Sequence, residues 1–169
     1  MIIETEFKGV KIIKRKNNID KRGSLEKIYN NKIMMKFRMD DIYYAKSKKK
    51  NTIRGLHYQE GEYSQRKIIT CLNGSFIDIA LDLRSNSKTF KKIFIYKLCE
   101  EEHQSIIIPK GFAHGIYTLK DNTTMLSMCE GDYIPEKEKG INILSLGLKF
   151  ISKNAILSEK DKNLKNFEL

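Results

Sequence analysis

Short runs rich in Ile, Tyr, Phe and Thr recur along the chain, with polar and turn-forming residues between them. Such runs predict β-strands. The sharpest turn signal is Asn73-Gly74, because both residues tolerate the positive φ of a type I′ hairpin turn. Many short strands with few helices favour an antiparallel sandwich or barrel. The predicted strands are 10–14, 33–37, 42–45, 52–58, 67–72, 75–83, 90–98, 105–108, 114–119 and 123–129.

The segment 75–83 alternates with a period of two, which places Asp78 and Asp82 on one face and four aliphatic residues on the other. We expect the aliphatic face to pack against a core. The acidic face either meets solvent or lines a barrel interior that holds a ligand, and the pattern alone favours solvent. Helix is expected only near Ser158-Glu159-Lys160-Asp161, which resembles a capped first turn.

The composition is that of one compact domain, here 1–169. The chain has 169 residues, of which 40% are hydrophobic and 31% charged, enough for a sizeable core. No apolar run approaches the roughly 18 residues of a membrane span, and the first residues lack a signal-peptide pattern. We therefore expect a cytoplasmic protein with no membrane partner. Cys71, Cys99 and Cys129 form no C-x-x-C pair and are expected to be buried thiols.

The net charge of +11 has two explanations. One is an anionic partner such as a nucleic acid, a membrane surface or a phosphorylated ligand. The other is compositional drift, because Lys and Asn are spread along the whole chain with no separate basic face. We favour drift and expect no nucleic-acid partner, although the run Lys46-Ser47-Lys48-Lys49-Lys50-Asn51 could attract a phosphate group locally.

Three histidines could carry acid–base chemistry. His57 and His114 each lie in a strand-like segment beside glycine, whereas His103 follows three glutamates and is expected to be a loop residue without a role. A metal site needs three or more ligands at compatible spacing, so none is predicted. Motifs for a Ser or Cys nucleophile, a P-loop or a dinucleotide site are also missing from the sequence.

Four segments occur in a characteristic order and at characteristic spacings. They are Arg54-Gly55-Leu56-His57-Tyr58-Gln59, Gln65-Arg66-Lys67, the run 77–84 followed by Thr89-Phe90, and the run 108–115. With these segments the chain resembles the dTDP-4-dehydrorhamnose 3,5-epimerase family, and the similarity runs from about residue 20 to residue 161. The resemblance implies an all-β fold, a cupin-like jelly roll (double-stranded β-helix) with short peripheral helices, and an isomerase that needs no cofactor or metal.

The resemblance also implies roles in catalysis. These enzymes invert carbons that flank a 4-keto group of a nucleotide sugar. His57 matches the general base, and Asp161 matches the carboxylate that orients this histidine. Lys67 matches the cation beside the enolate oxygen. Asp78 and His114 match polar residues of the same pocket. The resemblance therefore implies that the acidic face of 75–83 points into the barrel rather than toward solvent.

Further residues match the substrate-binding part of the family pattern. Arg54 and Arg22 match arginines that contact the diphosphate, where a bidentate fork suits phosphate oxygens. Arg22 would reach into the partner subunit's site, so a homodimer is implied. Gln59 and Tyr133 are also predicted to line the substrate site.

One departure from the family concerns the acid that reprotonates the sugar. A family tyrosine, six residues before the Tyr of Tyr-x-Pro, faces the catalytic histidine across the sugar. Here that position is Ser127, also assigned to the substrate site. Three outcomes follow: inversion of one carbon with a proton from solvent, replacement by Tyr133 or Tyr117, or loss of activity. We favour a single-centre epimerase, at C3 over C5.

A second departure concerns the base. The stretch 41–47 lacks the Gln and Asn with which the family helps to hold thymine. A purine could stack on Tyr43 or Tyr44, and Asp41 could accept hydrogen bonds from guanine. We therefore prefer a GDP-linked 4-keto-6-deoxy-heptose, in surface-polysaccharide (capsule) biosynthesis, over a dTDP-sugar. The alternatives are a 3,4-ketoisomerase of a nucleotide sugar, a non-catalytic sugar-nucleotide-binding cupin and, less favoured, a nucleic-acid-binding domain.

Overall fold

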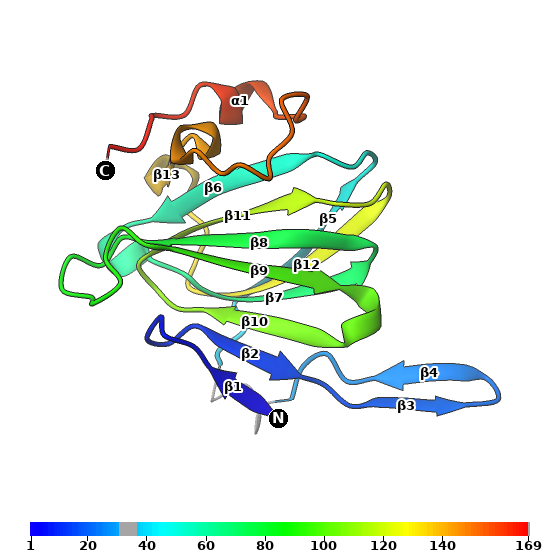
Figure 1. Ribbon diagram of the computed structural model, residues 1–169. Coiled ribbons are helices and arrows are strands. Elements are labelled where there is room, and N and C mark those ends of the chain that lie inside the picture. Colours follow the sequence, from blue (N-terminus) through cyan, green and yellow to red (C-terminus); the bar gives the residue numbers. More distant parts are fainter. Residues whose placement is uncertain (31–36, 169) are drawn as a thin grey trace.

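The computed structural model describes residues 1–30 and 37–168. The predicted strand 33–37 falls, except for Phe37, outside these residues. Within them the chain forms two antiparallel sheets and a separate hairpin (Figure 1). The hairpin consists of β3 (Asn17–Asp20) and β4 (Gly23–Glu26). Its strands carry few apolar residues, and they project from the body (Figure 1).

The larger sheet has six strands in the described part of the chain, all paired antiparallel. β5 forms one edge, and β12 lies between β5 and β7. In spatial order the strands are β1 (Ile2–Glu4), β2 (Lys11–Lys14), β10 (Gln104–Ile108), β7 (Arg66–Asn73), β12 (Thr123–Glu130) and β5 (Asp41–Ser47).

The second sheet has five strands among the described residues and carries most of the predicted histidine chemistry. Its strands pair antiparallel. Along the chain, β7, β10 and β12 belong to the six-stranded sheet and β8, β9 and β11 to this one. The chain therefore crosses repeatedly between the two sheets, as expected for a jelly roll. In spatial order they are β13 (Glu138–Gly140), β6 (Ile53–Gln59), β11 (Phe112–Thr118), β8 (Ser75–Asp82) and β9 (Ile93–Cys99).

The Asn73-Gly74 turn is a corner between the sheets, so the predicted type I′ hairpin is wrong. β7 pairs with β10 and β12, whereas β8 pairs with β11 and β9. Only Gly74 has a positive φ, of +79°. A Cβ at Gly74 would lie 2.6 Å from the Thr123 hydroxyl. Glycine is therefore needed here because the chain passes close to Thr123 at a corner between the sheets, and not because two hairpin strands pair on either side of the turn.

Both faces of β8 are buried, which explains its strict alternation. Phe76 and Ala80 pack in the core between the sheets, together with the fully buried Asp78. Ile79 and Leu81 pack on the opposite face, against apolar side chains of the C-terminal segment. The acidic face therefore looks inward, as the family resemblance implied, and the solvent-facing alternative is wrong.

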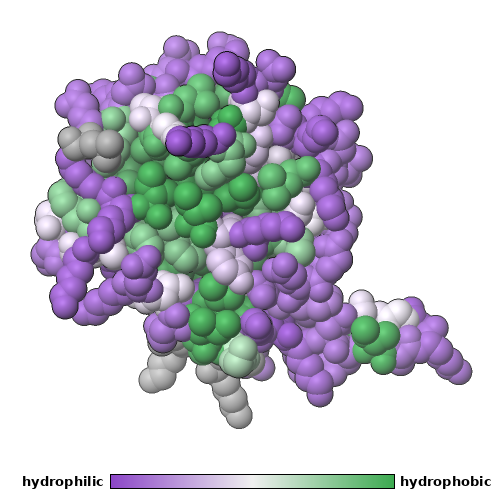
Figure 2. All heavy atoms as spheres, viewed as in Figure 1, coloured by the Kyte–Doolittle hydropathy of each residue, from purple (hydrophilic) through white to green (hydrophobic). Residues whose placement is uncertain are grey.

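The C-terminal segment covers the outer face of the five-stranded sheet (Figure 1). The predicted helix is α1 (Glu159–Lys162), capped by Ser158, whose hydroxyl accepts from the Asp161 N–H at 3.1 Å. On the face seen in Figure 2, apolar side chains gather in the middle and polar ones around them. The 3₁₀ turns are η1 (Gly61–Tyr63), η2 (Glu100–Glu102), η3 (Pro135–Lys137) and η4 (Ile143–Leu146).

Candidate active site

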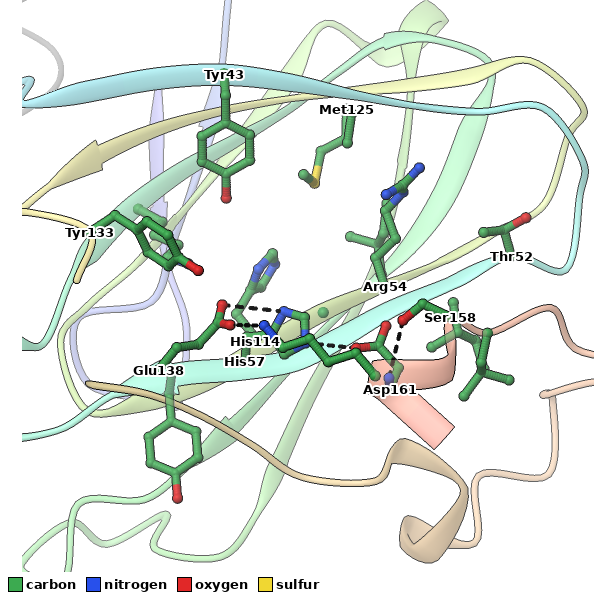
Figure 3. A pocket seen from close by; sticks show the side chains of 18 of the residues that line it. Tyr43, Thr52, Arg54, His57, His114, Met125, Tyr133, Glu138, Ser158 and Asp161 are labelled. Carbon is green, nitrogen blue, oxygen red and sulfur yellow. Dashed lines mark hydrogen bonds and ion pairs between the residues drawn. The ribbon is translucent and has the colours of Figure 1, made fainter. Parts of the chain in front are cut away.

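A cavity of about 700 Å³ opens between the two sheets. This volume lies within the usual range for small-molecule sites. β6, β11, β13 and α1 contribute one wall, and β5, β7 and β12 contribute the wall that faces it (Figure 3). The residues that the argument below uses are His57, His114, Arg54, Asp161, Glu138, Lys67, Tyr43 and Tyr133.

His57 and Asp161 form a hydrogen-bonded pair at the cavity wall (Figure 3). The Nε2 of His57 lies 2.8 Å from Oδ1 of Asp161. Asp161 is buried, and its Oδ2 accepts from the backbone N–H of Gly55 at 3.2 Å. The capped turn of α1 holds Asp161 in place from the other side. The pair thus has a fixed orientation before any ligand arrives.

The pair favours a defined protonation state. Burial alone would raise the pKa of Asp161, but the hydrogen bonds from His57 and Gly55 hold that pKa below its ordinary value. An ionised carboxylate only accepts hydrogen bonds, so Nε2 of His57 carries the proton. Nδ1 then keeps its lone pair, 3.8 Å from Oε1 of Glu138. A neutral imidazole in this state can accept a proton, and Asp161 stabilises the resulting charge.

His114 sits beside His57 on the next strand, where the two residues are directly paired. Its Nε2 lies 2.7 Å from Oδ2 of Asp78, which is fully buried on β8. Asp78 is not part of the cavity surface; it lies behind His114. Its Oδ1 has no hydrogen-bond partner among the described residues. The geometry therefore makes Asp78 a support for His114 rather than a direct contact with a ligand.

Arg54 and His57 both face the cavity although they are three residues apart on β6. In a regular strand such residues would point to opposite faces. The register between β6 and β11 shifts here, and Gly55 has a φ of +101°. A Cβ at Gly55 would lie 2.6 Å from the carbonyl oxygen of His114. Gly55 thus permits the irregular β6–β11 pairing that lets Arg54 and His57 face the same cavity.

Arg54 is anchored near the cavity by two hydrogen bonds. Its Nε donates to the Ser47 hydroxyl at 3.0 Å, and its Nη2 donates to the Lys46 carbonyl at 3.0 Å. The planar guanidinium keeps further N–H groups for an anion. Lys67 contributes a second cation from β7, on the facing wall.

Three more predicted site residues offer no free side chain to this cavity within one chain. Ser127 is fully buried below the cavity surface, with its Oγ 3.4 Å from the Cys129 sulfur. Arg22 lies in the β3–β4 turn, with 82% of its side chain exposed and a 2.6 Å ion pair to Asp20. Gln59 borders the cavity, but its amide is used by backbone groups of Tyr63, Asp132 and Ile134. Gln59 therefore shapes the Tyr133 loop.

Two tyrosines named in the sequence are also outside the cavity. Tyr117 is buried on the outer side of the five-stranded sheet, and its hydroxyl donates to Asn51 at 2.7 Å. It cannot replace the missing acid. Tyr44 is 70% exposed and does not line the cavity. Tyr43 and Tyr133 do line it.

The sequence reasoning missed Glu138 and Lys160. They form an ion pair, and both line the cavity beside His57. Glu138 lies in β13, a three-residue strand paired with β6. The segment Pro135-Glu136-Lys137-Glu138-Lys139 has the charge pattern of a loop, so no periodic signal marked it.

No group of three or more His, Cys, Asp or Glu side chains in residues 1–30 and 37–168 is arranged to hold a metal ion. Across the same residues, none of the helices has the length and apolar character needed to cross a membrane.

The fold and the site are those of a cupin-type jelly roll with a histidine–carboxylate pair, capable of acid–base chemistry, at its cavity. The family model of dTDP-4-dehydrorhamnose 3,5-epimerase matches residues 4–168. The dTDP-4-dehydrorhamnose 3,5-epimerase of Shigella flexneri is 33% identical, with 98% of this chain and 95% of that protein covered. The chain belongs to the dTDP-4-dehydrorhamnose 3,5-epimerase family, and it is therefore an epimerase. The sequence-based resemblance and the predicted jelly roll are confirmed.

Solved structures give the same result. The Bacillus anthracis dTDP-4-dehydrorhamnose 3,5-epimerase, with TDP and PPi bound, superposes with a TM-score of 0.93 at 31% identity, covering 99% of each chain. The Legionella pneumophila dTDP-6-deoxy-D-glucose-3,5-epimerase, in complex with dTDP-4-keto-L-rhamnose, gives a TM-score of 0.90 at 32% identity. In that comparison 98% of this chain and 92% of that chain are covered.

Proposed function

We propose that this protein epimerises a nucleoside-diphosphate-linked 4-keto-6-deoxy sugar by removing a proton next to the keto group. The observation that carries the proposal is the His57–Asp161 pair, which opens on a cavity that also holds a cation from the facing sheet. A hydrogen beside a carbonyl is acidic enough for a side-chain base only when the enolate is stabilised. The cavity supplies both requirements.

Each step has a named residue. Nδ1 of His57 takes the proton, and Asp161 stabilises the imidazolium that forms. The C–H electron pair becomes part of the enolate, whose oxygen is stabilised by the Lys67 ammonium. Arg54 binds the diphosphate, because a guanidinium fork suits phosphate oxygens. His114, supported by Asp78, donates a hydrogen bond to the sugar.

The proposal also concerns which carbons of the sugar are inverted. We propose inversion at C3 alone or at C3 and C5, in surface-polysaccharide biosynthesis in the cytoplasm. Ser127 lies beneath the cavity surface, so it does not take part directly. The names of the relatives, which specify 3,5-epimerases, support reaction at both carbons.

Two bases are candidates for the nucleotide. The relatives' names and bound ligands specify dTDP-sugars, and this supports thymine. The sequence favours guanine, and one observation supports it: Asp41 lines the cavity, where its carboxylate can accept hydrogen bonds from the N–H groups of guanine. Calorimetric titration of the protein with GDP and with dTDP distinguishes them, and Asp41→Asn should weaken only GDP binding if guanine is the base.

A homodimer is part of the proposal. The β3–β4 hairpin carries Ile19 and Leu25, which are 78% and 60% exposed. A two-stranded hairpin without a partner is marginally stable in water, so a second copy that covers these side chains would support it. Arg22 at the tip would then reach the partner's cavity.

Proton NMR in D₂O tests the proposed function. The protein is mixed with GDP-linked and dTDP-linked 4-keto-6-deoxy sugars, and deuterium at C3 and C5 is followed. We expect exchange in the wild type and in His103→Gln, which changes a histidine that does not line the cavity, but none in His57→Gln. Exchange in His57→Gln at the wild-type rate contradicts the mechanism. Movement of the carbonyl indicates a 3,4-ketoisomerase, and nucleotide binding without exchange indicates a binding protein.

A further inference from the structure

Inversion requires two groups on opposite sides of the sugar. A base that removes a proton and returns it from the same side regenerates the starting stereochemistry. His57 approaches from the five-stranded sheet, so the second group must come from the facing sheet. Packed sheets lie about 10 Å apart, which lets one sugar ring contact side chains of both walls.

Tyr43 is the tyrosine that faces His57 across the cavity. It lies on β5, the edge strand of the six-stranded sheet. Its side chain lines the cavity, and its hydroxyl points toward His57 and His114 (Figure 3). Met125 from the neighbouring β12 lies beside it in the same view. Tyr43 thus presents an O–H group to the side of a bound ring that His57 cannot reach.

The other tyrosines at the cavity are less well placed. Tyr133 lies in the loop between β12 and β13, near Glu138 of the sheet that carries His57 and near Tyr43 of the facing sheet. Burial raises the pKa of Tyr133, and the nearby Glu138 carboxylate raises it further. Tyr58 packs against the apolar layer outside the five-stranded sheet. Neither tyrosine lies on a strand of the wall opposite His57.

The strand pairing explains how Tyr43 takes this place. Ser127 on β12 is directly paired with Tyr43 on β5. A serine is short and stays beneath the cavity surface, which leaves room for the adjacent tyrosine ring. Burial raises the pKa of the Cys129 thiol, while the ammonium of Lys67 and hydrogen bonds with Ser127 and Tyr43 oppose that rise. Tyr43, Ser127, Cys129 and Lys67 therefore form one polar group on this wall.

We propose that Tyr43 is the catalytic acid that reprotonates the sugar on the side opposite His57, an inference that rests on the proposed function. The O–H bond of Tyr43 breaks, and its proton goes to the enolate carbon. The electron pair of the enolate forms the new C–H bond, and the C=O bond is restored. The phenolate of Tyr43 regains a proton and the imidazolium of His57 loses one to solvent, so the cycle has no net proton change.

The test separates proton removal from inversion. Wild type and Tyr43→Phe are incubated in D₂O with the 4-keto sugar that the wild type converts, and NMR follows both deuterium entry and epimer formation. Tyr43→Phe should keep deuterium entry, because His57 still exchanges the proton from its own side. Epimer formation should fall at least ~100-fold, the lower range for loss of a general acid.

Two variants serve as controls. Tyr44→Phe changes the next residue, which points away from the cavity, and should leave both rates unchanged. Tyr133→Phe tests the competing acid: because Tyr133 lines the substrate cavity, both rates can change, but the ratio of inversion to deuterium entry should stay that of the wild type. Thermal unfolding followed by circular dichroism checks that each variant is folded.

The outcomes are distinct. Inversion by Tyr43→Phe at the wild-type rate overturns the inference. Equal loss of exchange and inversion in a folded Tyr43→Phe also overturns it, because the hydroxyl would then act before reprotonation. A wild type that exchanges no hydrogen with any of the sugars contradicts the proposed function itself, and the inference with it.

Discussion

Asp161 Oδ1 lies 2.8 Å from Nε2 of His57, across a separation of 104 residues. One residue comes from a barrel strand and the other from a short capped helix in the segment that packs outside the barrel. The contact joins the two parts of the fold at the point where the chemistry is proposed. Its removal should affect catalysis more than stability.

Asp161→Asn should lower kcat by about 10²- to 10⁴-fold, because an amide can neither hold the His57 tautomer nor stabilise the imidazolium. Steady-state kinetics on the converted sugar measure the change. Glu159→Gln is the matched control, since it removes an exposed carboxylate from the same helix and should leave kcat unchanged. A similar kcat in both variants would contradict the role of the pair.

The buried pair of Asp78 and His114 should matter for stability. Asp78→Ala leaves His114 without its 2.7 Å partner inside the barrel, and loss of one partner of a buried pair costs about 3 kcal/mol or more. Urea unfolding at pH 7 should show this decrease in the free energy of unfolding. Asp132→Ala, at an exposed loop position, should change it by less than ~0.5 kcal/mol.

Asp82 should govern part of the acid stability. Burial raises its pKa, but hydrogen bonds from Arg84, Ser87 and Thr89 outweigh this and lower the pKa to about 2. The unfolded chain, with a value near 3.8, takes up the proton first as the pH falls. The stabilisation is therefore complete above a pH of about 4 and is lost as the pH falls from there to about 2.

Asp82→Asn should accordingly lower the free energy of unfolding at pH 7 by about 2 kcal/mol. It should also flatten the dependence on pH between 4 and 2. Urea unfolding at several pH values measures both effects. An unchanged slope in this window would show that Asp82 does not carry the acid sensitivity.

Gly55→Ala should disrupt the irregular β6–β11 pairing. The added Cβ would lie 2.6 Å from the His114 carbonyl oxygen, at a φ of +101°. Gly61→Ala is a matched control, because Gly61 also has a positive φ, of +59°, but nothing lies within 4 Å of its added Cβ. Gly61→Ala should lower the free energy of unfolding by only about 1 kcal/mol, the cost of a left-handed backbone at a residue with a Cβ. Gly55→Ala should cost more and reduce activity, as measured by urea unfolding and kinetics.

The proposed shared site predicts complementation between inactive variants. Arg22→Ala should lose activity through the partner's site, and His57→Ala through its own. After mixing and subunit exchange, roughly one quarter of the sites should contain both native residues if pairing in the symmetric dimer is random. Activity should then return in the mixture. No recovery, with exchange verified by mass spectrometry, would contradict the shared site.

The strand pattern predicted most of the jelly roll because β7, β8, β11 and β12 alternate or are continuously apolar. β13 escaped prediction because Glu138 lies among charged residues, and three paired residues leave no period to detect. The Asn73-Gly74 signal predicts a hairpin at what is a corner between sheets, because a turn signal gives only the local backbone conformation. It does not say which strands pair beyond the turn.

Site residues that belong to a sequence motif could be predicted, whereas those whose position depends on side-chain packing and strand pairing could not. His57, Arg54 and Asp161 meet at the cavity as the motifs implied. The place of Ser127 in the sequence predicts a site residue, but its short side chain stays beneath the cavity surface. The sequence suggests only base stacking for Tyr43, because its position across from His57 depends on the pairing of β5 with β12.

The segment that carries Asp161 follows every strand of the barrel along the chain. During synthesis, which adds about 5–20 residues per second, both sheets can form while this segment is still missing. The nascent barrel would then expose the outer apolar face around Ile79 and Leu81, and His57 would lack its partner. Docking of the last segment therefore buries this apolar surface and completes the His57–Asp161 pair at the same time. A chain cut before residue 158 should be both inactive and prone to aggregation.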